Sequence, residues 1–391
     1  MVAKMYYGNL IYICDADIAL DKIEKNSIQM IYIDPPYNTM SNSFEYSDRR
    51  DDWDKFISNL LKKANLVLKE SGVIFISIDD NKMVELRQIC NEIFGKNNFL
   101  GMFITRQATR SNSKHINTIH EYVLCYAKDC KFTPKFEILR TKIPIYKDEI
   151  EFLDKNIKME FKSNGKQSAQ ILLNKLLKKY ENLDEFSWIK NYNIVDDNGE
   201  ICFGKDLSVP GNPNSLDINE INLHLKPLKT RAWQSKDKFI KLHNENNLIF
   251  KNGRPYEKHM LLKSKDNVMS ILNFYSRHGK HDLERLGLGD IFSTAKPVEM
   301  IKYFIQITCG YDDIVLDFFA GSGTTAQAVI ESNLNDNTNR KFILCQIDEI
   351  VKNNKSIKIL QKNGYGNTIA DITLLRLAKL KEKYKFDYEM R

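Results

Sequence analysis

Apolar residues in the first third of the chain alternate between short unbroken runs and longer stretches with helical spacing. The runs at residues 30–33 and 73–78 are rich in β-branched and aromatic side chains, and each leads into an aspartate, which is typical of buried strands. Residues 53–68 and 83–94 instead place apolar side chains three or four positions apart, which predicts amphipathic helices. This alternation predicts parallel strand–helix–strand units with helices on both faces of one sheet.

The regular pattern stops near residue 131 and returns near residue 291. The segment between them is rich in Lys, Asn and Asp, with scattered Gly and Pro. After it come a strand, the start of a helix and a second strand, at residues 314–317, 324–332 and 342–347. We therefore predict one α/β domain split by a large insertion. The two halves of that domain and the insertion are predicted at residues 1–130, 291–391 and 131–290.

Composition limits the classes of protein that fit this pattern. The 391 residues are 42% hydrophobic, which is ordinary for a globular protein. No apolar run is long enough to span a bilayer and the first ten residues lack the pattern of a secretion signal, so we expect a cytoplasmic protein without membrane contact. The seven cysteines form no CxxC pair, which favours reduced thiols. The formal charge of +7 permits a polyanionic partner without establishing one.

Charge is unevenly distributed within the insertion. Residues 181–220 are acidic, whereas residues 221–280 hold thirteen Lys and Arg against four Asp and Glu. Basic side chains interleaved with aromatic rings fit contact with nucleic acid, and a solvated basic face is the alternative. The candidate DNA contacts in this segment are Arg231, Lys236 and Arg254. The four histidines of the basic stretch do not have zinc-ligand spacing, so no metal site is predicted.

The first chemical motif is the turn Asp34-Pro35-Pro36-Tyr37, directly after the strand at residues 30–33. Open sheets bind ligands at the carboxyl ends of their parallel strands, where this turn would lie. Two consecutive prolines fix φ and remove two N–H donors, which holds the carbonyls of Asp34 and Pro35 stiffly. The Asp34 side chain and the Pro35 carbonyl can accept both hydrogens of a base's exocyclic amine, and Tyr37 offers a ring for stacking. A strand-ending turn with an exposed tyrosine is the alternative.

The second motif is a strand ending at Asp317, the loop Phe319-Ala320-Gly321-Ser322-Gly323, and a helix beginning at Thr324-Thr325. Glycines at such a turn let a ligand approach the backbone closely. No lysine follows them, as a phosphate loop requires, and the third glycine of a dinucleotide fingerprint is missing. Hydroxyl groups at the amino end of a helix suit a small carboxylate, such as the methionine part of a cofactor. A structural turn is the alternative.

Paired in one chain, the two motifs resemble the amino-methyltransferases that act on adenine N6 or cytosine N4 of DNA. The turn precedes the insertion and the glycine loop, which resembles the permuted order of the β class. Related enzymes that methylate protein glutamine or RNA usually place the glycine loop first. Further stretches resemble the modification subunits of type III restriction systems, at residues 44–48, 72–80, 92–95, 120–128 and 295–301.

This resemblance covers roughly residues 8–130 and 290–375. It implies an α/β fold with a Rossmann-like S-adenosylmethionine-dependent methyltransferase sheet, a circularly permuted motif order and an inserted target-recognition domain. It also implies that Asp34, Pro35, Pro36 and Tyr37 are the catalytic residues around a flipped-out base. The cofactor S-adenosylmethionine is expected, without a metal, at Asp15, Lys296, Pro297, Asp317, Phe319, Ala320, Gly321, Ser322, Gly323, Thr324, Thr325 and Gln346.

The resemblance leaves two further points, one on the cofactor site and one on the DNA contacts. Related enzymes often have a Glu that binds both ribose hydroxyls at the position of Gln346, so the ribose contact is in question. Arg106, Arg110 and Lys114 follow the strand near Ile104 and are expected to touch DNA beside the flipped base.

The relatives methylate adenine N6, so we expect a site-specific adenine-N6 methyltransferase of duplex DNA that belongs to a restriction-modification system. A cytosine-N4 enzyme and a non-catalytic DNA-recognition subunit remain alternatives, and a nicotinamide dehydrogenase is disfavoured by the missing glycine. The chain has no Walker A motif, so it is not itself an ATP-driven restriction subunit. A separate restriction endonuclease is the candidate protein partner, while a stand-alone enzyme and a homodimer stay open.

Overall fold

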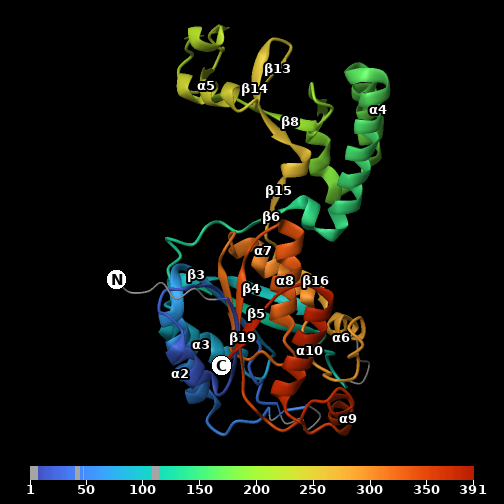
Figure 1. The fold of residues 1–391 in the computed structure, drawn as a ribbon. Coiled ribbons are helices and arrows are strands. Elements are labelled where there is room, and N and C mark those ends of the chain that lie inside the picture. Colours follow the sequence, from blue (N-terminus) through green and yellow to red (C-terminus); the bar gives the residue numbers. More distant parts are fainter. Residues whose placement is uncertain (1–7, 40–44, 47, 108–113) are drawn as a thin grey trace. The chain divides into compact units, whose positions relative to one another are not determined.

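A computed structural model describes residues 8–39, 45–46, 48–107 and 114–391 (Figure 1). Its contacts divide the chain into two compact units. The first unit combines residues 1–136 with residues 268–391, and the second is residues 137–267. Each unit is described by itself.

The first unit is built on one large sheet, which has nine strands among the described residues. In spatial order these are β16 (Ile271–Tyr275), β4 (Phe99–Arg106), β5 (His120–Ala127), β3 (Leu68–Ile78), β2 (Ile28–Ile33), β17 (Ile314–Asp317), β18 (Lys341–Gln346), β1 (Asn9–Ile13) and β19 (Tyr388–Met390). The two sequence halves of the unit meet in the middle, because β17 pairs in parallel with both β2 and β18. The predicted split α/β sheet is therefore present.

The predicted parallel units account for most of the sheet but not for one side. β5 pairs antiparallel with both β3 and β4, so the sheet is mixed. Among the described elements β5 follows β4 directly, and it runs beside β4 in the opposite direction. β3 also begins at Leu68, before the predicted start at residue 73, and passes through Gly72. A side chain at Gly72 would lie 2.9 Å from the Ile28 carbonyl oxygen, so the close approach of β2 requires glycine there.

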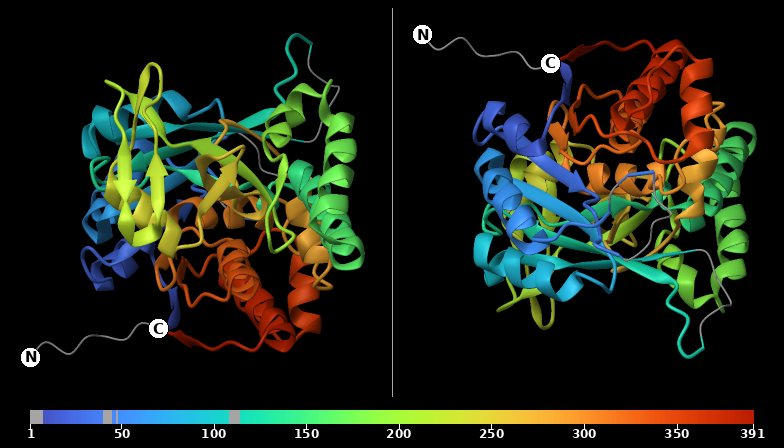
Figure 2. Two further views of the ribbon diagram at one scale, coloured as in Figure 1. Left: turned by 90° about the horizontal axis from the view of Figure 1, so that it is seen from above. Right: turned by 90° about the horizontal axis from the view of Figure 1, so that it is seen from below.

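Helices cover both faces of this sheet (Figures 1 and 2). On one face lie α1 (Ala16–Lys22), α2 (Trp53–Val67) and α3 (Met83–Ile93), whose apolar sides join the main core. The other face carries α7 (Val298–Thr308), α8 (Thr324–Asp336) and α10 (Ile369–Lys383), with α6 (Arg277–Glu284) and α9 (Asn354–Lys362) near them. There the rings of Phe75 on β3 and Phe304 on α7 stack at 4.4 Å. Burial of both faces explains the unbroken apolar runs in the sequence.

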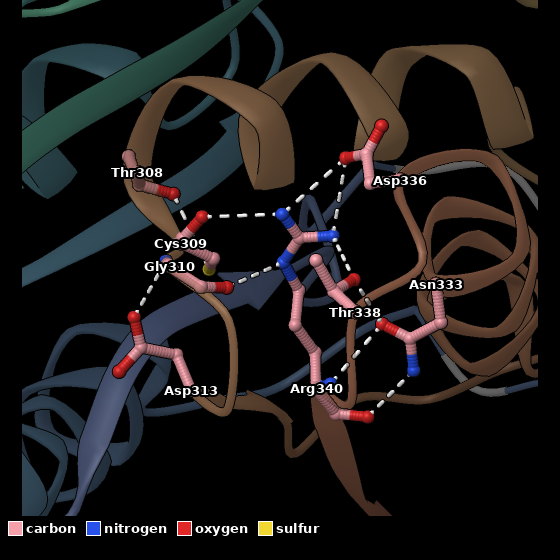
Figure 3. A network of polar contacts seen from close by, with 8 residues as sticks. All are labelled: Thr308, Cys309, Gly310, Asp313, Asn333, Asp336, Thr338 and Arg340. Carbon is pink, nitrogen blue, oxygen red and sulfur yellow. Dashed lines mark hydrogen bonds and ion pairs between the residues drawn. The ribbon is translucent and has the colours of Figure 1, made fainter.

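A buried arginine fixes the amino ends of the two strands that lead toward the glycine loop and Gln346 (Figure 3). Arg340, just before β18, donates to the carbonyls of Gly310 at 2.9 Å and Cys309 at 3.3 Å, which precede β17. Its guanidinium also meets Thr338 and the Asp336 carboxylate at the end of α8. The bond to Cys309 satisfies a carbonyl of a buried residue, and the bond to Gly310 fixes the turn that follows it. The opposite, carboxyl ends of β17 and β18 are left for the site.

The second unit has its own hydrophobic cores and more regular structure than its sequence suggested. A long helix, α4 (Pro144–Leu177), is kinked at Gly165, where φ is +79°. The spacing of Ile150, Leu153 and Ile157 on its buried side is helical, but Lys, Asn and Glu between them conceal the pattern. The second unit spans residues 137–267, fewer than the 131–290 predicted for the insertion. At its carboxyl side the difference arises because β16 joins the sheet of the first unit.

The remaining elements of the second unit are short. A four-stranded sheet runs in the order β13 (Leu248–Lys251), β14 (Arg254–Met260), β8 (Ile201–Asp206) and β7 (Ile194–Val195). Two-stranded pairs are formed by β6 (Glu137–Leu139) with β15 (Lys265–Asn267), β9 (Ser208–Pro210) with β12 (Arg231–Trp233), and β10 (Leu216–Ile218) with β11 (Leu223–Leu225). The helix α5 (Lys236–Asn244) follows β12. Of the helices that the structure describes, none has both the length and the apolar character needed to cross a bilayer.

Candidate active site

The carboxyl ends of neighbouring parallel strands bring the two sequence motifs together. Asp34 follows β2, Asp317 ends β17 and Gln346 ends β18, and these strands are adjacent in the sheet. A cleft of about 740 Å³, counting space open to solvent, lies at this edge. The predicted residues that line it are Asp34, Pro36, Lys296, Asp317, Phe319, Ala320, Gly321, Ser322, Thr324, Thr325 and Gln346. One cleft therefore carries both the Asp-Pro-Pro-Tyr turn and the glycine loop.

The remaining predicted residues lie outside the wall of this cleft. Asp15 caps α1 and lines a smaller adjoining pocket that shares Phe319 and Gln346 with the main cleft. Pro35 is buried in the turn, and Pro297 caps α7. Gly323 lies in the glycine loop, and Tyr37 meets the site through its hydroxyl.

The Asp34 carboxylate is bonded on one oxygen only. Its Oδ1 accepts from the Tyr37 hydroxyl at 2.8 Å and lies 3.3 Å from the Lys296 ammonium. Its Oδ2 has no hydrogen-bond partner among the described residues, and the side chain is 24% exposed. A carboxylate oxygen that faces a cleft without a donor can accept a hydrogen from a ligand. The Tyr37 hydroxyl fixes the orientation of the carboxylate.

Lys296 is held between two carboxylates. Its Nζ lies 2.8 Å from Glu121 Oε2 and also donates to the Tyr37 hydroxyl at 2.8 Å. Gln107 donates to the other oxygen of Glu121. Glu121 is the second residue of β5. The local sequence gives no sign that it pairs with Lys296, because this pairing depends on the antiparallel position of β5 in the sheet. It is the main residue of the site that sequence reasoning missed.

Burial and charge shift the acid–base behaviour of this cluster. Burial raises the pKa of Asp34, and the Lys296 ammonium offsets part of that rise. Burial alone would lower the pKa of Lys296, but the charges of Asp34 and Glu121 raise it above its ordinary value. Burial and the Asp34 charge hold the pKa of Tyr37 well above its usual range. Lys296 is therefore an ammonium and Tyr37 a neutral hydroxyl at neutral pH.

The turn is braced by two side chains that follow it in the sequence. Asp48 accepts from the backbone N–H groups of Tyr37 at 2.7 Å and Thr39 at 2.6 Å. The Trp53 indole N–H donates to the Pro36 carbonyl at 2.6 Å. The double proline leaves few backbone donors, so these bonds from side chains take over the role of regular secondary structure. Rigidity of the turn thus comes from its neighbours as well as from its prolines.

The glycine loop turns sharply into α8. Gly321 and Gly323 have φ of +53° and +79°, and the Gly323 N–H donates to the Ala320 carbonyl at 2.7 Å. The Gly321 N–H donates to Gln346 Oε1 at 2.8 Å, which ties the loop to the end of β18. The left-handed conformation explains the two glycines. Gln346 therefore has one oxygen engaged in holding the loop.

Asp317 is a buried carboxylate with uncharged partners. Its Oδ2 accepts from the Thr325 hydroxyl at 2.5 Å and its Oδ1 accepts from the Phe319 N–H at 3.0 Å. Burial raises the pKa of Asp317 to about 7, against the effect of these two hydrogen bonds. The group lines the cleft, so a cation there would find a carboxylate that has no ion pair among the described residues.

The residues predicted to contact DNA are dispersed. Arg106 ends β4 and meets the Tyr275 hydroxyl at 3.5 Å, and Lys114 is exposed beyond it. Arg110 lies outside the described residues. The other three belong to the second unit and have partners there: Arg254 pairs with Asp206 at 2.9 Å, Lys236 pairs with Glu220 at 2.9 Å, and Arg231 donates to Ser208 Oγ at 2.6 Å. Their role stays a prediction.

The described part of the chain contains no group of three or more His, Cys, Asp or Glu side chains placed to hold a metal ion. The cleft itself offers a hydrogen-bond acceptor at Asp34, a fixed ammonium at Lys296, and hydroxyls and backbone groups at the glycine loop.

Comparison with known proteins gives consistent matches. The profile of a family described as DNA methylase, spanning N6 and N4 enzymes, matches residues 28–358. The Mod subunit of the type III restriction-modification enzyme EcoP15I from Escherichia coli is 30% identical, over 91% of this chain and 60% of its own length. The type II methyltransferase M.KpnI from Klebsiella pneumoniae is 26% identical, over 98% of this chain and 88% of its own length.

The chain thus spans about three-fifths of the length of the EcoP15I Mod subunit. Among solved structures, the cytosine-N4-specific PvuII DNA methyltransferase is 12% identical with a TM-score of 0.45, covering 98% of this chain and 94% of its own. A likeness of that size supports no conclusion about this chain's chemistry.

Proposed function

The chain belongs to the N6/N4 DNA methylase family, and from that membership we propose that it transfers a methyl group from S-adenosylmethionine to adenine N6 in duplex DNA. The observation that carries the proposal is the single cleft whose wall includes both Asp34 and the glycine loop. Such a cleft lets a base amine at the turn face a methyl donor at the loop. The type III Mod relatives favour adenine over cytosine.

The residues present fit S-adenosylmethionine. Glycines in the left-handed conformation keep the loop backbone open to a ligand, and Asp317 offers a carboxylate for an ammonium group. The absence of a third glycine argues against a dinucleotide. When bound, S-adenosylmethionine supplies a methyl group on a positively charged sulfur, which needs no metal.

The reaction requires the amine nitrogen to present its lone pair, which in a base is delocalised into the ring. Asp34 Oδ2, the oxygen without a partner, would accept one amine hydrogen. The Pro35 carbonyl would accept the other, and together they would draw the nitrogen toward tetrahedral geometry. Lys296 and Tyr37 hold Asp34 in place through Oδ1, so the acceptor is positioned before the base arrives. Positioning of fixed acceptors is the catalytic contribution of the turn.

The partners follow from the same proposal. Duplex DNA is the substrate, and the base is extruded into the cleft, since a stacked base would be out of reach of Asp34. Arg106, Arg110 and Lys114 would contact DNA near the base, and Arg231, Lys236 and Arg254 of the second unit would contact its backbone or read its sequence. The Mod relatives suggest a separate restriction subunit as protein partner.

The decisive experiment replaces Asp34 by Ala and measures transfer of tritiated methyl groups to DNA. We expect loss of at least about a thousandfold in rate, because the acceptor of the amine hydrogen is gone. Binding of S-adenosylhomocysteine should change less than about threefold, since the glycine loop is untouched. Asp312→Ala, an exposed carboxylate before β17, is the matched control and should behave as the native chain. Retained activity in Asp34→Ala would refute the proposed role.

The methylated base is identified by digesting the product DNA to nucleosides and measuring their masses. N6-methyl-2′-deoxyadenosine supports the proposal, whereas N4-methyl-2′-deoxycytidine would assign the same cleft to the other base of the family. A chain that binds DNA and S-adenosylhomocysteine yet transfers no methyl group to DNA of any sequence would be a recognition subunit. Methylation-aware sequencing of DNA from cells that express the chain would reveal the recognised sequence.

A further inference from the structure

The underside of the glycine loop is held by α10. Thr373 Oγ1 donates to the Gly321 carbonyl at 2.6 Å, and Arg376 Nη1 donates to the Ser322 carbonyl at 3.3 Å. A capping box at Thr368 fixes the start of this helix. The family profile ends at residue 358, before α10, so the comparison with the family assigns no role to these contacts.

Arg376 is a fully buried cation whose hydrogen-bond partners are all uncharged. Its side chain is 0% exposed. Nη1 donates to Ser322 Oγ at 3.0 Å and to Thr324 Oγ1 at 2.9 Å. Nε and Nη2 donate to Gln327 Oε1 at 3.1 and 2.8 Å. A buried charge normally pairs with a carboxylate, so a guanidinium that meets only dipoles requires an explanation.

Asp282 and Glu331 are the carboxylates whose charges act most on Arg376, and neither forms a hydrogen bond with it. Glu331 is reached only through Gln327, whose Nε2 donates to Glu331 Oε1 at 2.9 Å, and Asp282 accepts instead from the Val298 N–H at 3.0 Å. Burial lowers the pKa of Arg376 to about 10, and the charges of Asp282 and Glu331 only partly offset this. The guanidinium therefore remains charged at neutral pH, directly behind the loop.

Arg376 also fixes the direction of two hydroxyl groups. A guanidinium has donors and no acceptor, so Ser322 Oγ and Thr324 Oγ1 must both accept from it. The two oxygens are 3.4 Å apart, so at most one of the two hydroxyl hydrogens can serve the other hydroxyl. At least one O–H is then left to donate to a ligand in the cleft that both residues line.

The loop end of the cleft thus holds a cation and, apart from it, an ionisable carboxyl group. Among the described residues, Arg376 is bonded only to neutral oxygens, and Asp317 accepts only from the Thr325 hydroxyl and the Phe319 N–H, so an ammonium beside Asp317 would favour its ionised form. A ligand that carries both an ammonium and a carboxylate would complement this pair. The amino-acid part of an S-adenosyl compound has these two groups.

We propose that Arg376 is the positioning residue for the carboxylate of the S-adenosyl amino acid, acting through the hydroxyls of Ser322 and Thr324. The inference rests on the proposed function, because it assumes that the cofactor occupies this cleft. Arg376 does not touch the ligand. It orients the donors that do, and it supplies the positive potential that favours a carboxylate over a neutral group at that place.

The test compares two ligands on the full-length chain by isothermal titration calorimetry. One is S-adenosylhomocysteine, and the other is its decarboxylated analogue, which keeps the nucleoside and the ammonium. We expect the native chain to prefer the carboxylated ligand by at least about tenfold, the order expected for one charge-assisted interaction. Arg376→Gln should reduce this preference to about twofold while changing the Kd of the decarboxylated ligand less than about threefold.

Two further variants keep the result interpretable. Lys379→Gln removes the same charge one turn along α10, away from the loop, and should leave the preference unchanged. Arg376→Lys keeps the charge and loses the planar fork, so a preference above about threefold is expected. If Arg376→Gln does not fold, which circular dichroism and thermal melting reveal, Arg376→Lys decides alone.

Equal weakening of both ligands in either Arg376 variant would overturn the proposal, because a purely structural role would have that effect. It is also overturned if the native chain binds both ligands alike. A native chain that binds neither ligand would instead contradict the proposed function, so the two failures are distinguishable.

Discussion

The two ends of the cleft treat buried charge in opposite ways. At the turn, the ammonium of Lys296 lies 2.8 Å from Glu121 and 3.3 Å from Asp34, so opposite charges are paired directly. At the glycine loop, Arg376 and Asp317 are each surrounded by hydroxyls, amides and backbone groups and have no ion pair with a described residue. The turn end is internally compensated, whereas the loop end keeps a cation and an ionisable carboxyl group without ion-pair partners among the described residues.

This difference matches the ligands that the proposed function requires. A base is neutral and is recognised by hydrogen bonds, so a compensated cluster with one open acceptor suits it. An amino acid is a zwitterion, so separated charges suit it better than a preformed ion pair, which it would have to break. We therefore expect substitutions at the turn to lower stability and activity by leaving charge uncompensated. Substitutions at the loop should change the affinity for the ligand and the dependence of stability on pH.

The largest effect is expected from Lys296→Met. This variant leaves the carboxylates of Asp34 and Glu121 close together and without their cation, which should destabilise the fold by about 3–5 kcal/mol. The rate of methyl transfer should fall by about a hundredfold or more, since Asp34 Oδ1 loses one of its two partners and keeps only the Tyr37 hydroxyl. Urea unfolding and a methyl-transfer assay measure the two effects.

The double variant Lys296→Met, Glu121→Gln is the matched control. It removes one negative charge together with the cation, so it should recover about half of the lost stability or more without recovering the activity. A double variant that is as unstable as Lys296→Met would mean that packing of the lysine stem, and not charge, holds the turn together.

The second effect is a dependence of stability on pH that comes from Asp317. Its pKa is about 7 in the folded chain and near 3.9 when unfolded, so between these values the folded state holds a proton that the unfolded state has lost. Stability from this group is therefore present at low pH, falls as pH rises through this window, and levels off above about 7. Between pH 5 and pH 8 the loss is roughly 2–3 kcal/mol at about 1.4 kcal/mol per pH unit.

Asp317→Asn removes this titration and keeps the shape of the side chain. Between pH 5 and pH 8 the free energy of unfolding in urea should fall less for this variant than for the native chain. The difference should be roughly 2–3 kcal/mol. Saturating S-adenosylhomocysteine should flatten the native profile, since an ammonium beside Asp317 favours the ionised carboxylate. Parallel profiles for the two chains without ligand would show that the carboxylate is not buried as described.

The residues of the two ends of the cleft also illustrate what the sequence could predict. Asp317 and Asp34 follow apolar runs that are buried strands, so the local pattern placed both at the same edge of the sheet. Lys296 was assigned to the cofactor from the resemblance, and the structure places it on the cleft wall between two carboxylates. Its partner Glu121 depends on the antiparallel pairing of β5, which no local pattern encodes.

The same distinction explains the misses elsewhere. Arg376 lies on an amphipathic helix far along the chain, where one more Arg among lysines gives no sign that it is fully buried. In the second unit, α4 was missed because charged and amide residues separate its apolar positions, although Ile150, Leu153 and Ile157 keep helical spacing. The sequence predicted elements whose period is local, and it missed contacts made only by tertiary packing.

A smaller effect is expected from Gly323→Ala. At this position φ is +79°, and an added Cβ would lie 3.3 Å from Thr373 Cγ2 of α10. The left-handed conformation costs a non-glycine residue about 1–2 kcal/mol, and the crowding should move the loop off α10. We expect S-adenosylhomocysteine to bind about tenfold more weakly.

Gly364→Ala is the control for Gly323→Ala, because Gly364 has the same φ of +79° and nothing within 4 Å of the added Cβ. It should lose similar backbone stability in urea unfolding but bind S-adenosylhomocysteine as the native chain does. Equal loss of binding in both variants would assign the effect to general destabilisation and not to the loop.

The smallest effect concerns Gln346, where related enzymes often have a glutamate. Gln346→Glu keeps an oxygen for the Gly321 N–H, now 2.8 Å away, but loses the donor to the Ile347 carbonyl at 3.1 Å. A carboxylate at this place would strengthen hydrogen bonds to ribose hydroxyls and would cost less than about 1 kcal/mol in lost backbone bonding. We expect 5′-methylthioadenosine, which has the ribose but no amino acid, to bind two- to fivefold more tightly. Gln346→Ala should weaken it instead, because the loop loses its tie to β18. If Gln346→Ala weakens binding and Gln346→Glu leaves it unchanged, the ribose lies elsewhere and Gln346 serves only to hold the loop.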